Sequence, residues 1–151
     1  MRRHALVVVP VKYEVKVDVK APPEVLWSVL ADPSHWPLIS DSFIKVEPQG
    51  AGGLELGAVY LVRQPSIRPM KWTVTELEPG TAFTWRMSVP GVTSTGAHRV
   101  VAQPGGSRLE LVLEQTGLLS RAISAMGGAH YRALVDREAA TFAGAAEHRA
   151  R

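Results

Sequence analysis

The sequence predicts a single α+β domain in which an antiparallel sheet packs against a long C-terminal helix. Three observations favour this class: residues 11–20 alternate between apolar and charged side chains, a long central run alternates short apolar stretches with turn residues, and residues 118–148 contain no proline and many alanines. A chain of 151 residues fits one domain, so we expect residues 1–151 to form one unit with a lead-in at 1–10.

The first element is a strand. Between residues 11 and 20 the odd-numbered positions are Val or Tyr and the even-numbered positions are Lys, Glu or Asp. A period of two with one polar side predicts a half-buried antiparallel strand.

Two short helices should follow this strand, each opened by proline. Pro22 and Pro23 end the strand, and proline is tolerated in the first turn of a helix. Residues 25–30 then place an apolar stripe on one helical face, with Trp27 on its flank. Asp32-Pro33 repeats the arrangement, with Asp32 expected as the N-cap, and a further proline at position 37 limits the second helix to little more than a turn.

Six more strands are expected after residue 42, which makes seven in all. Their predicted ranges are 43–47, 57–64, 70–77, 83–88, 93–102 and 109–114, and the segments between them are rich in Pro and Gly, including a predicted loop at 65–69. Short connections favour pairing of neighbours as an antiparallel meander. The C-terminal helix is predicted over residues 118–148, with Gly127-Gly128 expected to loosen or bend it near its middle.

Composition narrows the classes of function. The chain has no cysteine, which excludes disulfides and thiol chemistry and suits a cytoplasmic location. The net charge of +3 comes largely from arginines near the two ends, so we expect no nucleic-acid binding. No apolar run is long enough to cross a membrane, and the five apolar residues at 5–9 are too few for a signal peptide, so no stable membrane insertion is expected.

Metal and cofactor motifs are missing from the sequence. The five histidines never occur at a familiar ligand spacing, and the glycines at 50–53 lack the lysine and the following helix of a phosphate loop. We therefore expect no metal and no cofactor.

Candidate polar residues lie on the C-terminal helix and on one strand. A helical wheel places Ile123, His130, Leu134, Glu138 and Thr141 on one inward face, flanked by Met126 and others. A neutral imidazole at His130 could act as acid or base, or could simply be satisfied by a carbonyl or by solvent. Strand 93–102 is polar on both sides, with His98 on one of them, which fits a strand beside a wet cavity or at an open edge.

Aromatic and apolar residues on the strands are the expected partners of this helix. Trp72, Phe83, Trp85 and Met87 either fill a core or form the wall of a ligand site. Arg86 alternates with them and is expected to point outward unless a bulge reverses the register. Trp36 on the second short helix either covers a ligand or packs that helix onto the sheet.

Four short motifs, in this order, carry a resemblance to a known family. They are residues 21–27 (APPEVLW), residues 32–37 (DPSHWP), Trp72-Thr73-Val74 with Glu76, and residues 78–80 (EPG) followed by 83–86 (FTWR). With the order of elements, they resemble the START-like (SRPBCC, helix-grip) superfamily, specifically its polyketide cyclase/dehydrase and lipid-transport group. The resemblance covers about residues 13–142.

This resemblance implies a seven-stranded antiparallel sheet curled around the long helix, with an apolar cavity between them. The expected function is binding of a hydrophobic or aromatic small molecule, lipid or polyketide-like, by a monomer or homodimer. The expected lining residues are Trp36, Trp72, Phe83, Trp85, Met87, Ile123, Met126, His130, Leu134 and Glu138.

Two alternatives stay open. One is a polyketide cyclase or aromatase that closes and dehydrates a poly-β-ketone, with His130, His98 and Arg86 as the catalytic candidates. The other is an interaction module without a ligand. An edge strand at residues 5–9 that pairs with a second copy is a further possibility.

Overall fold

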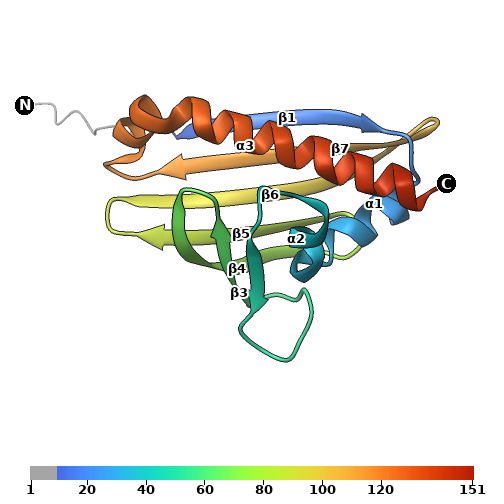
Figure 1. The fold of residues 1–151 in the computed structure, drawn as a ribbon, viewed down its shortest axis with the longest axis horizontal. Coiled ribbons are helices and arrows are strands. Elements are labelled where there is room, and N and C mark those ends of the chain that lie inside the picture. The colour runs from blue at the N-terminus through green and yellow to red at the C-terminus, as the bar shows by residue number, and fades with distance from the viewer. Residues whose placement is uncertain (1–9) are drawn as a thin grey trace, which may run out of the picture.

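A computed structural model describes residues 10–151 of the chain (Figure 1). The edge strand considered for residues 5–9 lies outside the described range. The elements are β1 (Val11–Val19), α1 (Pro23–Leu30), the 3₁₀ turn η1 (Pro33–His35), α2 (Trp36–Ile39), β2 (Lys45–Pro48), β3 (Val59–Gln64), β4 (Ile67–Glu78), β5 (Ala82–Val89), β6 (Val92–Gln103), β7 (Gly106–Thr116) and α3 (Ser120–Arg149).

The seven strands form one antiparallel sheet in the order β1-β7-β6-β5-β4-β3-β2. Strands β2 to β7 form the predicted meander, and β1 adds to the far side of β7. The predicted apolar side of β1 faces inward, where Tyr13 pairs in register with Leu113 and Val17 with Leu109. The expected α+β helix-grip architecture is therefore confirmed.

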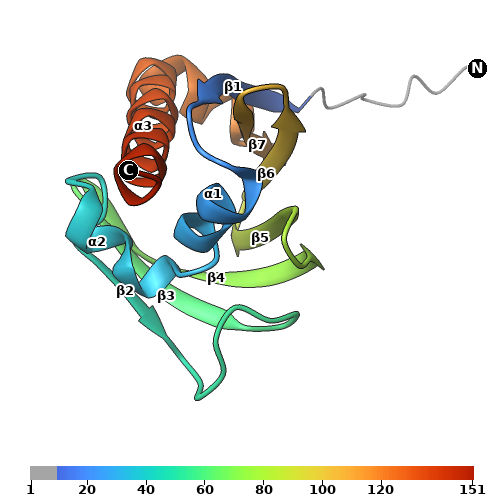
Figure 2. The same cartoon turned by 90° about the vertical axis from the view of Figure 1, so that its right-hand side faces the viewer.

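The sheet is strongly curved, and α3 lies along its concave face (Figure 2). Pairing shifts by a bulge between Val62 and Gln64 and by another between Val74 and Glu76. Bulges bend a strand and increase its twist, which helps the sheet to curl around the helix.

The predicted loop at residues 65–69 is wrong in its extent. Only Pro65 and Ser66 form the turn, with Ser66 at φ 63°, and β4 already begins at Ile67. Pro69 is accommodated because it lies within the bulged end of this hairpin, opposite the register shift, where a missing N–H disturbs no regular ladder.

The two short helices lie between β1 and β2 and close one end of the molecule (Figure 2). Asp32 takes the N-cap position of η1, but its side chain makes no capping hydrogen bond. Its carboxylate instead contacts Nδ1 of His35 at 2.6 Å, so the local pair replaces the expected cap.

The C-terminal helix α3 is continuous from Ser120 to Arg149, with no break at Gly127-Gly128. Gly128 lies close to β1: a Cβ there would be 3.1 Å from the Tyr13 hydroxyl. That hydroxyl contacts Ser124 Oγ at 2.9 Å, one turn earlier on α3. Gly128 therefore permits close packing of α3 on the sheet.

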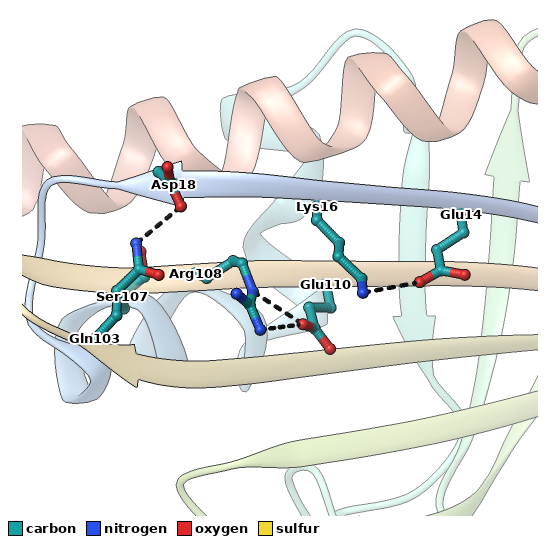
Figure 3. Close-up of polar contacts among 7 residues, drawn as sticks. All are labelled: Glu14, Lys16, Asp18, Gln103, Ser107, Arg108 and Glu110. Atoms are coloured by element: carbon teal, nitrogen blue, oxygen red, sulfur yellow. Dashed lines mark hydrogen bonds and ion pairs between the residues drawn. The ribbon is translucent and has the colours of Figure 1, made fainter.

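The outer face of the sheet is polar, as the alternation in β1 predicts. Figure 3 shows part of it, where the Gln103 amide donates to Asp18 Oδ1 at 2.8 Å and Arg108 Nε donates to Glu110 Oε2 at 2.9 Å. These contacts belong to β1, β6 and β7 and leave the concave face free for apolar residues.

Candidate ligand-binding cavity

A cavity of about 230 Å³ lies between the concave face of the sheet and α3. Its lining is mostly apolar and aromatic. The lining side chains include Trp36, Val62, Gln64, Ile67, Arg68, Met70, Trp72, Trp85, Met87, Val89, Ser94, His98, Leu111, Leu113, Gln115, Ile123, Tyr131, Leu134 and Glu138.

Trp36 closes the inner end of the cavity. It is 1% exposed, and its Nε1 donates to the Val29 carbonyl at 3.1 Å. Its ring lies 4.8 Å from Phe142 of α3 and 5.3 Å from Trp85 of β5, measured between centroids. Of the two roles considered for Trp36, this packing favours the one that fixes the short helix to the sheet, because a movable cover would not be held from three sides.

Two further tryptophans form one wall. Trp85 on β5 and Trp72 on β4 lie 5.6 Å apart between ring centroids. Gly96 on β6 makes room for the Trp85 indole, since a Cβ at Gly96 would be 3.0 Å from Trp85 Nε1. An alanine at position 96 would therefore force the Trp85 indole to shift.

His98 lines the cavity from the central strand β6 and is 6% exposed. Its ring stacks on Phe83, with centroids 4.2 Å apart and planes at 10°. Its Nδ1 lies 3.3 Å from the Phe83 carbonyl, which can only accept, so Nδ1 carries the proton when this bond forms. Burial lowers the pKa of His98 to about 4, so the ring is neutral at pH 7 and its Nε2 is a hydrogen-bond acceptor.

Glu138 lines the same cavity from α3. Gln64 Nε2 of β3 donates to its Oε1 at 3.2 Å. Burial raises the pKa of Glu138 to about 8, against the opposing effect of the Gln64 hydrogen bond. At pH 7 the carboxyl is therefore largely protonated and can donate a proton or a hydrogen bond.

β6 and β7 contribute two more polar groups, Ser94 and Gln115, which pair in register and are 4% and 3% exposed. Gln115 Oε1 has no hydrogen-bond partner among the described residues. The inward residues Ser94, Gly96 and His98 explain why strand 93–102 lacks an apolar side: β6 is a central strand, and one of its faces borders the cavity.

A protein-family model described as polyketide cyclase / dehydrase and lipid transport matches residues 10–147. The match covers nearly the whole chain. The chain belongs to this family. The expected membership of the START-like superfamily is thereby confirmed.

Solved structures support the same fold for this family member. The Zhui aromatase/cyclase from Streptomyces sp. R1128 is similar with a TM-score of 0.74 and 23% identity, over 95% of this chain and 97% of that chain. Norcoclaurine synthase from Thalictrum flavum has a TM-score of 0.67 and 16% identity, over 91% and 97%. A major latex-like protein from Panax ginseng has a TM-score of 0.68 and 11% identity, over 85% and 94%. No curated protein matches the chain.

The structure brings together seven of the ten residues expected to line the cavity. They are Trp36, Trp72, Trp85, Met87, Ile123, Leu134 and Glu138. Phe83 is buried behind the wall, where it supports His98 and does not border the cavity.

Met126 and His130 do not belong to the lining. Met126 is 90% exposed and His130 is also exposed, so the inward position expected for both is wrong. The buried face of α3 is centred on Val135, Ala139 and Phe142, turned by about one residue from the predicted face.

The catalytic candidates are likewise separated. His98 borders the cavity, His130 faces solvent, and Arg86 is exposed on the opposite side of β5 from Trp85 and Met87, as the alternation predicts. Sequence reasoning missed Gln64, Ser94 and Gln115 as lining residues. Alternation with apolar neighbours marks Ser94 and Gln115 as inward, but nothing local in the sequence points to Gln64.

Within residues 10–151, no group of three His, Cys, Asp or Glu side chains is placed to hold a metal ion. None of the helices in that range is long and apolar enough to span a membrane.

Proposed function

We propose that this protein binds an apolar or aromatic small molecule in the cavity between its sheet and α3. The observation that carries the proposal is the cavity itself: about 230 Å³ enclosed by tryptophan, leucine, valine and methionine side chains. For comparison, an apolar cavity of roughly 150 Å³ is enough to bind benzene. A few convergent polar groups in an apolar pocket are typical of ligand sites, and His98, Glu138 and Gln115 supply them.

Intrinsic fluorescence gives a direct test. Trp36, Trp72 and Trp85 line the cavity, so a bound ligand should change tryptophan emission. The purified protein would be titrated with fatty acids, isoprenoids and polycyclic aromatics, and native mass spectrometry would identify what co-purifies with it.

A matched pair of variants makes this test specific. Ser94→Phe places a ring in the cavity, whereas Ser88→Phe makes the same change at an exposed position on β5. We expect Ser94→Phe to lower ligand affinity at least about tenfold and Ser88→Phe to leave it unchanged. Equal affinity in both variants would show that the ligand binds elsewhere.

The pair formed by His98 and Glu138 favours a second candidate, an enzyme that closes and dehydrates a poly-β-ketone. At pH 7 one cavity holds a neutral imidazole that can accept a proton and a protonated carboxyl that can donate one. Groups whose environments shift their pKa values in opposite senses suit acid–base work.

Together, His98 and Glu138 can carry out the proton transfers that a cyclodehydration needs. His98 takes a proton from a methylene between two ketones, the resulting enolate carbon bonds to a distant carbonyl carbon, and Glu138 protonates the new alkoxide. In the second step the Glu138 carboxylate removes an α-proton while the His98 imidazolium protonates the departing hydroxyl as water. Both residues return to their starting forms.

Binding and turnover measured together separate the two candidates. With a poly-β-ketone thioester as probe, His98→Gln and Glu138→Gln should each lower the rate by about 10²-fold or more while ligand affinity changes little. A protein that binds the probe and releases it unchanged, with and without these substitutions, is a carrier only.

A further inference from the structure

The mouth of the cavity lies at the end of the molecule opposite to Trp36. It is bordered by the β3–β4 turn, the β5–β6 turn and the first turns of α3, which contribute Ile67, Arg68, Val89 and Ile123 to the lining. In Figure 1 the β5–β6 turn and the β7–α3 connection lie together at the left-hand end.

Large apolar side chains point into solvent around this mouth. Leu118 is 86% exposed, Met126 is 90% exposed and Leu119 is 50% exposed. Leu119 lies against the β5–β6 turn, where its backbone N–H donates to the Gly91 carbonyl at 2.9 Å. Leu119, Ile123 and Met126 follow one another at i, i+4 and i+7, so they form a stripe along the start of α3. We call Leu118, Leu119 and Met126, with Val89, the apolar rim.

The charges near the rim are mostly positive. Residues 63–72, 86–96 and 115–132 contain no Asp or Glu. The carboxylates beside them are Glu14 on β1 and Glu114 at the end of β7, and Glu114 is paired with Lys12 at 3.8 Å. The basic residues of these three segments are Arg63, Arg68, Lys71, Arg86, Arg121 and Arg132. Across residues 10–151, none of the six is in a salt bridge with a carboxylate.

Exposed aliphatic side chains with Lys and Arg side chains near them are the features that place a protein on an anionic bilayer. The aliphatic groups enter the boundary between headgroups and acyl chains, and each nearby Lys or Arg adds about 1 kcal/mol of attraction to the anionic surface. A bilayer needs no complementary shape, so it can accept a rim of flexible Leu and Met side chains that no fixed partner surface has to match.

We propose that the apolar rim docks this protein on anionic membranes with the cavity mouth facing the bilayer. The mouth then opens where apolar molecules partition, so a ligand enters the cavity without crossing water. This uptake rests on the proposed ligand binding, whereas the docking itself does not.

Co-sedimentation of the full chain with vesicles tests the docking. We expect binding to phosphatidylcholine vesicles that contain phosphatidylglycerol, weak binding to phosphatidylcholine alone, and loss of binding as salt is raised. The double variant Leu118→Ser/Met126→Ser should lower the vesicle-binding constant at least about tenfold. Arg68→Gln and Arg121→Gln should each lower it about fivefold.

Controls of the same chemistry lie far from the rim. Leu56→Ser changes a leucine that is 67% exposed in the β2–β3 loop, and Arg151→Gln removes a charge at the C-terminus, at the opposite end in Figure 1. Both should bind vesicles like the wild type. Equal losses in the controls, or no vesicle binding by the wild type, would overturn the docking proposal.

Two further outcomes also contradict it. If Leu118→Ser/Met126→Ser dissociates an oligomer in size-exclusion chromatography, the rim is an interface between copies. If an acidic protein binds the rim while anionic vesicles do not, the partner is a protein.

Failure of the docking and failure of ligand binding can be told apart with one more variant. Ser94→Phe should lose ligand binding but keep vesicle binding, and Leu118→Ser/Met126→Ser should show the reverse for a ligand added in solution. A protein that binds vesicles but no ligand would overturn the proposed function alone.

Discussion

At the scale of single residues, the cavity holds two groups that burial shifts in opposite directions. The pKa of His98 falls to about 4 and that of Glu138 rises to about 8, so both are favoured in their neutral forms. For His98 the associated stability is present above its unfolded pKa near 6.5 and is lost as the pH falls toward 4. For Glu138 it is present below the unfolded pKa near 4.5 and is lost as the pH rises toward 8.

Between pH 6.5 and 8 the loss at Glu138 dominates, because His98 is neutral in the folded state and at most half protonated in the unfolded state. We expect the free energy of unfolding of the wild type to fall across this window, by about 1.5 kcal/mol. Glu138→Gln keeps an amide partner for Gln64 and cannot ionise, so its free energy of unfolding should stay nearly constant. Urea denaturation at several pH values measures both, and a parallel fall in the variant would contradict the shifted pKa.

At the scale of elements, α3 shows how a helix is matched to a sheet by small residues. Two adjacent glycines, Gly127 and Gly128, lie in its first third, and both lower helix propensity. Only one of them is needed for packing: Gly128 lies under the Tyr13 hydroxyl, whereas the nearest atom to a Cβ at Gly127 would be 3.6 Å away, on the Tyr131 ring.

Alanine at each glycine should therefore have different effects. Gly127→Ala gains helix propensity at ordinary contact distance, so we expect the free energy of unfolding to rise by about 1 kcal/mol. Gly128→Ala gains the same propensity but places its methyl 3.1 Å from Tyr13 Oη and 3.2 Å from Ser124 Oγ, so the gain should shrink or reverse. Thermal unfolding of the two variants tests this, and equal stabilisation would show that the approach to Tyr13 relaxes at little cost.

At the scale of the whole molecule, Trp36 and Trp72 both border the cavity but differ in how deeply they are buried. Trp36 is the first residue of α2 and is 1% exposed. Its side chain contacts α1 through Val29, the sheet through Trp85 and α3 through Phe142, so it joins all three parts. Trp72 is only partly buried and borders the cavity on β4.

Replacing each of these two by leucine should separate stability from binding. Trp36→Leu should lower the free energy of unfolding by about 3 kcal/mol, because it leaves a void among Phe43, Phe142 and Trp85. Trp72→Leu should cost about 1 kcal/mol and mainly alter ligand affinity. Urea denaturation and ligand titration of both variants check this, and a larger stability loss at Trp72 would contradict the assignment.

The order and type of the elements could be predicted along the chain because local patterns carry them. The alternation of β1, the prolines that open α1 and η1, and the proline-free run of α3 are each visible within a few residues. The motifs in turn identify the family and hence the presence of a cavity. The inward positions of Trp72, Trp85 and Met87 follow from the period of two.

The rotation of α3 could not be predicted, because its apolar residues are spread around the helix and its first turns contain mostly small side chains. Contact with β1 through Tyr13, Ser124 and Gly128 selects the face that packs. That choice turns Glu138 toward the cavity and His130 toward solvent.

The sequence alone thus determines the elements that surround the cavity: a sheet of seven strands, a long helix and a wall of tryptophans. The sequence already places Glu138 on the expected inward face and His98 on a strand beside a cavity, but only the tertiary structure adds Gln64 and Gln115 and excludes His130. His98, Glu138, Gln64 and Gln115 come from β6, α3, β3 and β7, and only the curvature of the sheet around α3 brings them together. Burial in the cavity then shifts the pKa values of His98 and Glu138, which no local pattern in the sequence encodes.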